Sequence, residues 1–100
     1  MHRVDVPVPF DHPAFAGHFP GQPLLPGVSL LAEVLEAVMC EPALMASVGL
    51  APRIAAVKFL APIRPGAMLS VQLDDSSGAV RFEVRSAQTL VASGNFERAR

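Results

Sequence analysis

The sequence predicts an α+β fold in which one long apolar helix packs against an antiparallel sheet. Between residues 26 and 39 apolar side chains cover most of a helical circumference, whereas beyond residue 53 they alternate with polar ones in short runs. Turn-forming residues separate the later runs, which favours antiparallel neighbours. With 100 residues and no internal repeat, the chain is expected to form a single domain over residues 1–100.

The first expected element is a short edge strand at residues 3–8, where polar and apolar residues alternate until Pro7 and Pro9 interrupt the hydrogen-bond ladder. Asp11 and Pro13 follow, and they offer a cap and a first-turn proline for one brief helical turn.

The long helix is expected to begin near Pro26 and to run to about Met39, with Pro42 as its stop signal. Its apolar positions form one stripe at Val28, Leu31, Leu35 and Val38, continued by Leu30, Val34 and Ala37. Since little of the circumference is polar, we expect the helix to be buried, with Cys40 as a small buried hydrophobe near its end.

Residues 41–52 form a looser connection in this interpretation. Period-two strands are then expected at residues 54–60, 68–73 and 80–84, and a less regular one at residues 90–96. The segment 74–78 has the composition of a hairpin loop, and residues 87–88 can form the next tight connection. The strands should therefore follow one another as an antiparallel meander.

Composition narrows the class of protein. Apolar residues make up 51% of the chain and charged residues 17%, which leaves little polar surface for an isolated small domain and suggests an oligomer. The net charge of −1 shows no basic excess for nucleic acid. The single cysteine and the absence of a signal-like segment predict a cytoplasmic protein, and Glu33 and Glu36 interrupt the longest apolar stretch, which argues against a membrane span.

The loop before the helix carries the first candidate site residue. Residues 17–28 read Gly-His-Phe-Pro-Gly-Gln-Pro-Leu-Leu-Pro-Gly-Val, so that His18 sits in a stiff loop that leads into a helix N-terminus. The first N–H groups of a helix lack intrahelical partners and can polarise a carbonyl. An imidazole beside them forms a plausible acid/base site.

This loop resembles the signature of the hotdog-fold dehydratases that act on 3-hydroxyacyl thioesters in fatty-acid or polyketide-type synthesis. Residues 57–66, Val-Lys-Phe-Leu-Ala-Pro-Ile-Arg-Pro-Gly, resemble the family's strand-and-turn element after the central helix. The resemblance implies a curved antiparallel sheet wrapped around that helix. It also implies a homodimer or higher homo-oligomer, an acyl carrier protein that holds the substrate, a trans-2-enoyl product, and no metal or organic cofactor.

The resemblance also assigns roles to residues. His18 matches the family's base, and Gly27 matches the glycine whose N–H points at the thioester carbonyl. We expect Val28, Ser29 and Phe19 to contribute to substrate binding beside Gly27.

One position departs from the family pattern. The family's acidic residue lies fourteen residues after the histidine, and that position is Ala32 here. Glu33 is rotated by about 100° from it, and Glu36 lies one turn further along the helix. Either carboxylate could act through water, or both could simply lie on the solvent-facing side of the helix without a role in catalysis.

Several functions therefore stay open at this point. The chain is a dehydratase with a relocated carboxylate, a slow dehydratase that uses His18 and water, an acyl-binding scaffold subunit without turnover, or a hotdog thioesterase in which a glutamate activates water. Near the second motif, Arg53, Lys58 and Arg64 either receive the acidic surface of a carrier protein or are scattered surface charges. Phe59 either fills the core or lines an acyl tunnel.

Overall fold

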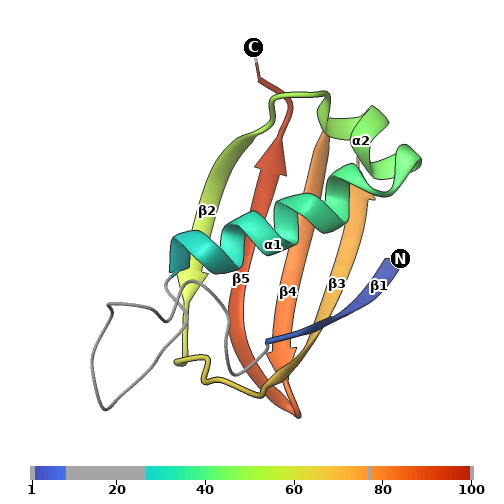
Figure 1. Ribbon diagram of the computed structural model, residues 1–100. Helices are drawn as coiled ribbons and strands as arrows, with labels where there is room; N and C mark the ends of the chain where they lie inside the picture. The colour runs from blue at the N-terminus through green and yellow to red at the C-terminus, as the bar shows by residue number, and fades with distance from the viewer. Residues whose placement is uncertain (1, 9–26, 77, 100) are drawn as a thin grey trace.

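The computed structural model describes residues 2–8, 27–76 and 78–99, which form a five-stranded sheet and two helices. The elements are β1 (His2–Pro7), α1 (Gly27–Met39), α2 (Pro42–Val48), β2 (Arg53–Phe59), β3 (Met68–Ser76), β4 (Ala79–Ser86) and β5 (Thr89–Glu97). All strand pairs are antiparallel, and α1 crosses one face of the curved sheet (Figure 1). The hotdog architecture expected from the sequence is confirmed. The helical turn expected near Asp11 and the loop that carries His18 lie outside the described residues.

The core lies between α1 and the inner face of the sheet. One cross-strand row shows how it is filled, because Leu73 on β3 pairs with Phe82 on β4, and Phe82 pairs with Gly94 on β5. The Phe82 ring occupies the space that a side chain on Gly94 would need, since a Cβ there would lie 2.8 Å from Phe82 Cζ. In the neighbouring row Phe96 meets the same ring with a centroid separation of 5.3 Å.

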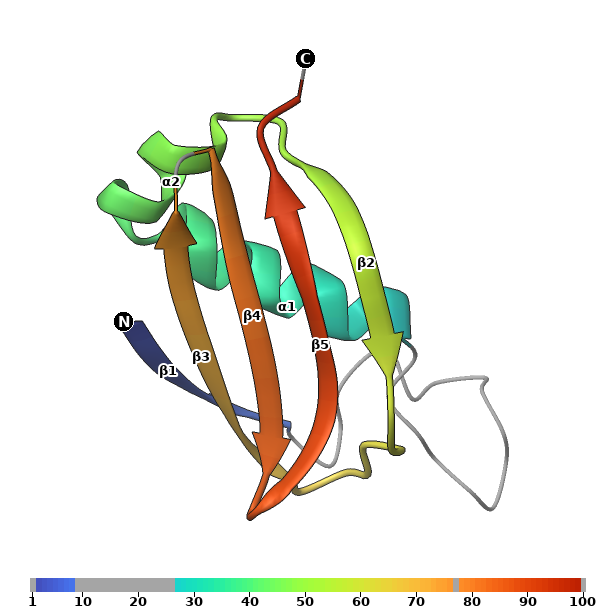
Figure 2. The same ribbon diagram turned by 180° about the vertical axis from the view of Figure 1, so that it is seen from behind.

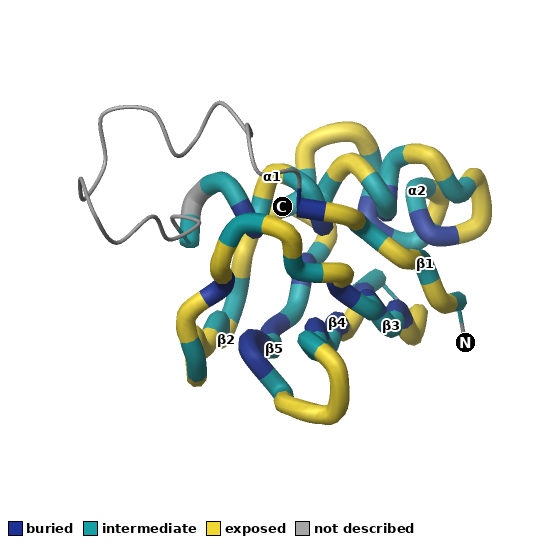
Figure 3. The backbone as a smooth tube through the Cα atoms, turned by 60° about the horizontal axis from the view of Figure 1, so that its bottom comes forward, coloured by how far each residue is buried: buried dark blue, intermediate teal, exposed yellow. Residues whose placement is uncertain are grey.

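Helix α1 has the predicted bounds but a different buried stripe. Its fully buried side chains follow the i, i+4 spacing at Leu30, Val34 and Val38, whereas Leu31 and Leu35 are only partly buried. Every fourth residue on the other side is exposed, as at Ala32, Glu36 and Cys40. Figure 3 shows exposed and partly buried stretches alternating along α1. The expectation of a buried helix therefore holds for one side of α1 only, and the expectation of a buried Cys40 was wrong, because only one layer of sheet covers α1.

A second helix, α2, occupies part of the segment that was expected to be a loose connection. Pro42 ends α1 and also starts α2, because proline at the first helical turn needs no N–H partner. Leu44 and Val48, four residues apart, are both buried. Gly49 closes the helix with a positive φ of 80° and donates its N–H to the Met45 carbonyl.

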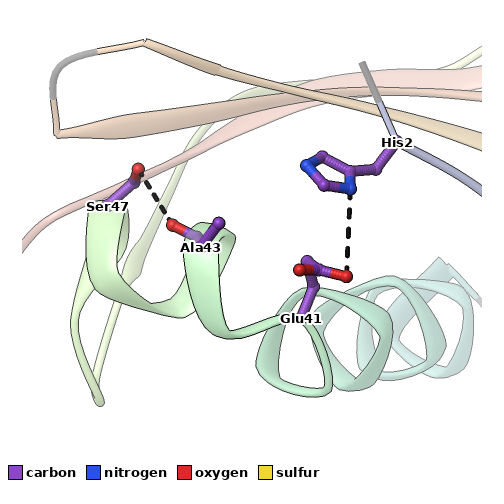
Figure 4. Close-up of polar contacts among 4 residues, drawn as sticks. All are labelled: His2, Glu41, Ala43 and Ser47. Atoms are coloured by element: carbon purple, nitrogen blue, oxygen red, sulfur yellow. Dashed lines mark hydrogen bonds and ion pairs between the residues drawn. The ribbon is translucent and has the colours of Figure 1, made fainter.

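The C-terminal tail and β3 both hold α2 in place. The Arg98 guanidinium donates a hydrogen bond to the Ala46 carbonyl near the end of the helix. The Ser47 hydroxyl lies 3.2 Å from Asp75 Oδ2 on β3. It also lies 3.3 Å from the Ala43 carbonyl, within α2 (Figure 4). These contacts keep α2 over the end of the β3–β4 hairpin (Figure 1).

The strand order corrects the expected meander. Only β3, β4 and β5 follow one another in the sheet, whereas β2 lies at the far edge and pairs with β5 (Figure 2). The β3–β4 hairpin is also tighter than expected, because the paired strands reach Ser76 and Ala79. The tight connection expected at residues 87–88 is confirmed between β4 and β5.

Strand β2 contains a β-bulge. The register shifts between Ala55, which pairs with Asn95, and Lys58, which pairs with Ser93, so that one extra residue lies on the β2 side. Ala56, inside this bulge, has a positive φ of 53°. Because side chains alternate along a strand, the extra residue reverses which face each later side chain occupies.

Over the described ranges, neither helix has the length and apolar content that crossing a membrane requires.

Candidate functional site

The N-terminus of α1 begins at Gly27, directly beneath an aromatic ring from β2. A Cβ on Gly27 would lie 2.7 Å from Phe59 Cζ, so the ring packs against the glycine backbone and leaves no room for a side chain. The bulge in β2 makes this contact possible, because it turns Phe59 toward the helix side of the sheet. Phe59 is itself half-exposed, so the ring forms a wall that remains open to ligand or partner.

Three of the predicted substrate-binding residues, Gly27, Val28 and Ser29, are the first three residues of α1. The structure therefore brings them together at the helix end whose N–H groups lack intrahelical partners. Ser29 is partly buried. The two other expected members of the site, His18 and Phe19, lie outside the described residues.

Position 32 faces solvent in the described part of the chain. Ala32 lies about 7.5 Å along the helix axis from Gly27, at about 1.5 Å per residue. Glu36 shares the exposed side with Ala32 but lies about 13.5 Å from Gly27 by the same measure. Within one subunit, the structure thus does not bring Glu36 next to the helix N-terminus.

The two candidate glutamates instead line a groove between β1 and the C-terminal half of α1. The groove has a volume of about 310 Å³ and is lined by Val4, Asp5, Val6, Pro7, Glu33, Glu36, Ala37, Cys40 and Glu41. Glu33 is partly buried and has an interaction partner. Both glutamates therefore face β1, whereas Gly27 faces β2.

Two acidic residues of this groove, Asp5 and Glu41, were not identified from the sequence. His2 on β1 lies beside Glu41, with 3.8 Å between Nδ1 and Oε2, a contact that is an ion pair only when the imidazole is protonated (Figure 4). No periodicity could have indicated that β1 lies beside the end of α1, because the contact depends on β1 pairing with β3. For Phe59, by contrast, the second family-like motif gave a signal, although the contact with Gly27 could not be read from it.

The three basic residues in and near the second family-like motif lie in different places in the structure. Arg53 pairs with Glu97 across β2 and β5, with 2.8 Å between Nη2 and Oε1. Lys58 points to the face of the sheet opposite α1, and Arg64 is exposed in the segment between β2 and β3. These three residues do not form one continuous patch with the α1 N-terminus.

Sequence comparisons identify relatives among dehydratases. The chain is 34% identical over 92 residues to the 3-hydroxyacyl-(acyl-carrier-protein) dehydratase FabZ of Chlamydia trachomatis serovar L2, a match that covers 86% of this chain and 60% of that protein. It is 32% identical over 71 residues to the FabZ of Symbiobacterium thermophilum, covering 67% of this chain and 50% of that protein. The chain thus spans between half and three-fifths of the length of these curated relatives.

Solved structures give the same fold. The dehydratase heterocomplex ApeI:P from Xenorhabdus doucetiae matches with a TM-score of 0.74 and 28% identity, covering 98% of this chain and 86% of that chain. The fluoroacetyl-CoA-specific thioesterase FlK matches with a TM-score of 0.68 at 19% identity, covering 99% of this chain and 88% of that one, which is a likeness of fold alone. The model of the ApeI-like family, described as ApeI dehydratase, matches residues 1–95. The chain belongs to the ApeI-like dehydratase family.

Proposed function

We propose that this protein removes water from 3-hydroxyacyl thioesters held on acyl carrier protein and releases trans-2-enoyl thioesters. The observation that carries the proposal is the match to the dehydratase family over residues 1–95, which includes the His18 loop and the first turn of α1. The open wall of Phe59 over Gly27 supports it, because a thioester carbonyl needs access to the helix N-terminus.

The chemistry uses a base and an oxyanion site. His18 takes the proton from C2 of the acyl group, while the N–H of Gly27 donates to the thioester oxygen and stabilises the developing enolate. The electron pair of the C2–H bond forms the C2=C3 double bond. The C3–O bond breaks as the hydroxyl receives a proton, and the hydroxyl departs as water.

The proton donor for the departing hydroxyl is the part of the site that departs from the family pattern. Alanine at position 32 carries no proton. Glu36, the next carboxylate on the same exposed side, lines the groove beside β1, so it would reach the hydroxyl only through a chain of several waters. The separation of about 13.5 Å from Gly27 along the helix predicts slow turnover.

The active unit is proposed to be a homodimer that pairs through β2. No described strand pairs with the outer edge of β2, and Ile54, Phe59 and Leu60 near it are about half exposed. An unpaired apolar edge is a template for a second strand. Because Phe59 also contacts Gly27, pairing there would place the second subunit beside the N-terminus of α1.

We further propose a cytoplasmic location and a single hotdog domain over residues 1–100. The lone cysteine supports the first assignment, and the continuous core from β1 to β5 supports the second.

The test follows the two possible products separately. Purified protein is incubated with a 3-hydroxyacyl thioester of acyl carrier protein, and enoyl formation and free thiol are measured. We expect enoyl product, at least a hundredfold less in His18→Ala, and unchanged product in the control His2→Ala. Thiol release without enoyl product, or full activity in His18→Ala, would contradict the proposal.

The departure at position 32 gives a second arm of the same test. We expect Ala32→Glu to raise the rate of dehydration, because it supplies a carboxyl about one turn closer to Gly27 than Glu36 does. In the wild-type chain, Glu36→Gln should lower the rate. A folded Ala32→Glu variant with no gain would contradict the assigned pocket.

A non-catalytic acyl-binding subunit is the second candidate, and the alanine at position 32 favours it. The similar structure from Xenorhabdus doucetiae is described as the dehydratase heterocomplex ApeI:P. If this chain serves such a complex, it should yield no product alone and should bind a complete dehydratase. The assay above, repeated with the chain alone and with that partner, separates the two functions.

A further inference from the structure

The face of the sheet opposite α1 carries a polar hollow of about 300 Å³. Its lining residues are Ala56, Lys58, Arg81, Ser93, Gly94 and Asn95. They come from the three adjacent strands β4, β5 and β2, and their register brings Arg81 opposite Asn95 and Lys58 opposite Ser93. The hollow is therefore built by strand pairing and does not depend on a loop.

The β2 bulge creates this hollow. Without the extra residue, alternation from Ala55 would turn Lys58 toward the core, but the register shift places it on the outer face instead. The left-handed backbone of Ala56, at φ 53°, is unfavourable for a residue with a side chain. Strained bulges of this kind often re-aim a functional side chain.

Among the described residues, the two cations of the hollow have no ion-pair partner, whereas other cations of this face do. Arg53 contacts Glu97 at 2.8 Å and Arg85 contacts Glu83 at 3.8 Å. Arg3 likewise contacts Asp5 at 3.5 Å. Within the described ranges, Lys58 and Arg81 form no ion pair.

None of the described residues that line the hollow is acidic. Asp74 is the cross-strand neighbour of Arg81, and it has an interaction of its own. Glu83 follows on the same face of β4, where Arg85 contacts it. Two positive charges thus remain over a floor made of small residues, Ala56 and Gly94.

We propose that this hollow binds a phosphate monoester. The two cations match the dianion, and the guanidinium fork, ammonium group, serine hydroxyl and asparagine amide together supply enough donors for its three terminal oxygens. A carboxylate offers one charge and two oxygens and would leave part of this set unused. An acidic protein surface would need cations spread over a wider area, where the remaining ones are already paired.

The test uses the full chain labelled with nitrogen-15 and titrated with glycerol 3-phosphate, with sodium chloride at equal ionic strength as the blank. We expect saturable amide shifts centred on Ala56, Ser93, Gly94 and Asn95. The affinity should rise between pH 5 and pH 7 as the monoester takes its second charge, near pH 6. Shifts centred on the α1 N-terminus, or no saturable shifts, would overturn the proposal.

A matched pair of double variants distinguishes the hollow from general charge. Lys58→Gln with Arg81→Gln should weaken binding at least tenfold. Arg53→Gln with Arg85→Gln removes the same charge from the same face and should leave the affinity within twofold. Equal weakening in both would overturn the proposal, and urea unfolding confirms that both variants are folded.

A last arm identifies the source of the phosphate group. Vesicles that contain phosphatidic acid are sedimented with the protein and compared with neutral vesicles. Co-sedimentation that depends on Lys58 and Arg81 assigns the site to a lipid phosphate, whereas binding of glycerol 3-phosphate alone assigns it to a soluble ester. Because the hollow lies on the face opposite α1, none of these results depends on the proposed dehydration.

Discussion

At the scale of single residues, two glycines show that the cost of adding a Cβ depends on its surroundings, even where the nearest atom is equally close. At Gly94 a Cβ would meet Phe82, which is fully buried and held by Phe96. At Gly27 it would meet Phe59, which is about half exposed and free to turn outward. The cost of added volume depends on whether the neighbour can move.

We therefore expect Gly94→Ala to destabilise the protein by about 1–3 kcal/mol, because the buried ring cannot withdraw. Gly27→Ala should cost less than about 1 kcal/mol, since Phe59 can rotate away from the new methyl group. Urea unfolding of both variants measures the difference. Equal costs would mean that Phe59 is held as firmly as Phe82.

At the scale of elements, α2 shows how a short helix depends on tertiary contacts. Its seven residues are too few for stability alone. Leu44 and Val48 bury one face of it, and Arg98 and Asp75 contact it through polar groups. The helix is therefore a consequence of the assembled core.

This gives a matched test with one residue type. Leu44→Ala should reduce the free energy of unfolding by about 2–5 kcal/mol, because the side chain is fully buried. Leu50→Ala, at a position that is 86% exposed, should change it by less than about 0.5 kcal/mol. Chemical denaturation measures both, and similar values would contradict a structural role for α2.

The elements also show how far the sequence could predict this molecule. The bounds of α1 were predictable because Pro26 and Pro42 flank its apolar run, and the three central strands were predictable from their alternation. The α2 helix was not, because its short apolar pattern resembles a loop until a core exists to cover it. The position of β2 beside β5 depends on long-range pairing that leaves no local pattern.

The candidate site divides in a similar way. The sequence was enough to place Gly27, Val28 and Ser29 at a helix N-terminus, because Pro26, which marks the start of the helix, lies directly before them in the family-like motif. The side chain that covers Gly27 and the groove that receives Glu33 and Glu36 come from β2 and β1, more than twenty residues away in each case. Such contacts follow from the topology of the sheet.

At the scale of the whole molecule, the sheet has two unlike edges. At one edge β1 is short and carries a groove rimmed by acidic residues. The other edge, along β2, exposes Ile54, Phe59 and Leu60. An exposed apolar edge favours association through that side.

We expect the wild-type protein to elute as a dimer in size-exclusion chromatography with light scattering, and Ile54→Lys to elute as a monomer, because a charge at the edge opposes strand pairing. The control is Met68→Lys, at an equally exposed position on β3, which should stay dimeric. A dimer that persists in Ile54→Lys would place the interface elsewhere.

The bulge at Ala56 also makes the length of β2 critical. Removing one residue there would reverse the side-chain alternation in the rest of β2. The ammonium of Lys58 would then enter the core, and the aromatic ring of Phe59 would leave Gly27 for the outer surface. A single deletion would thus damage two separate surfaces together. In engineered versions of this chain, single-residue deletions in β2 should be far more harmful than most single substitutions.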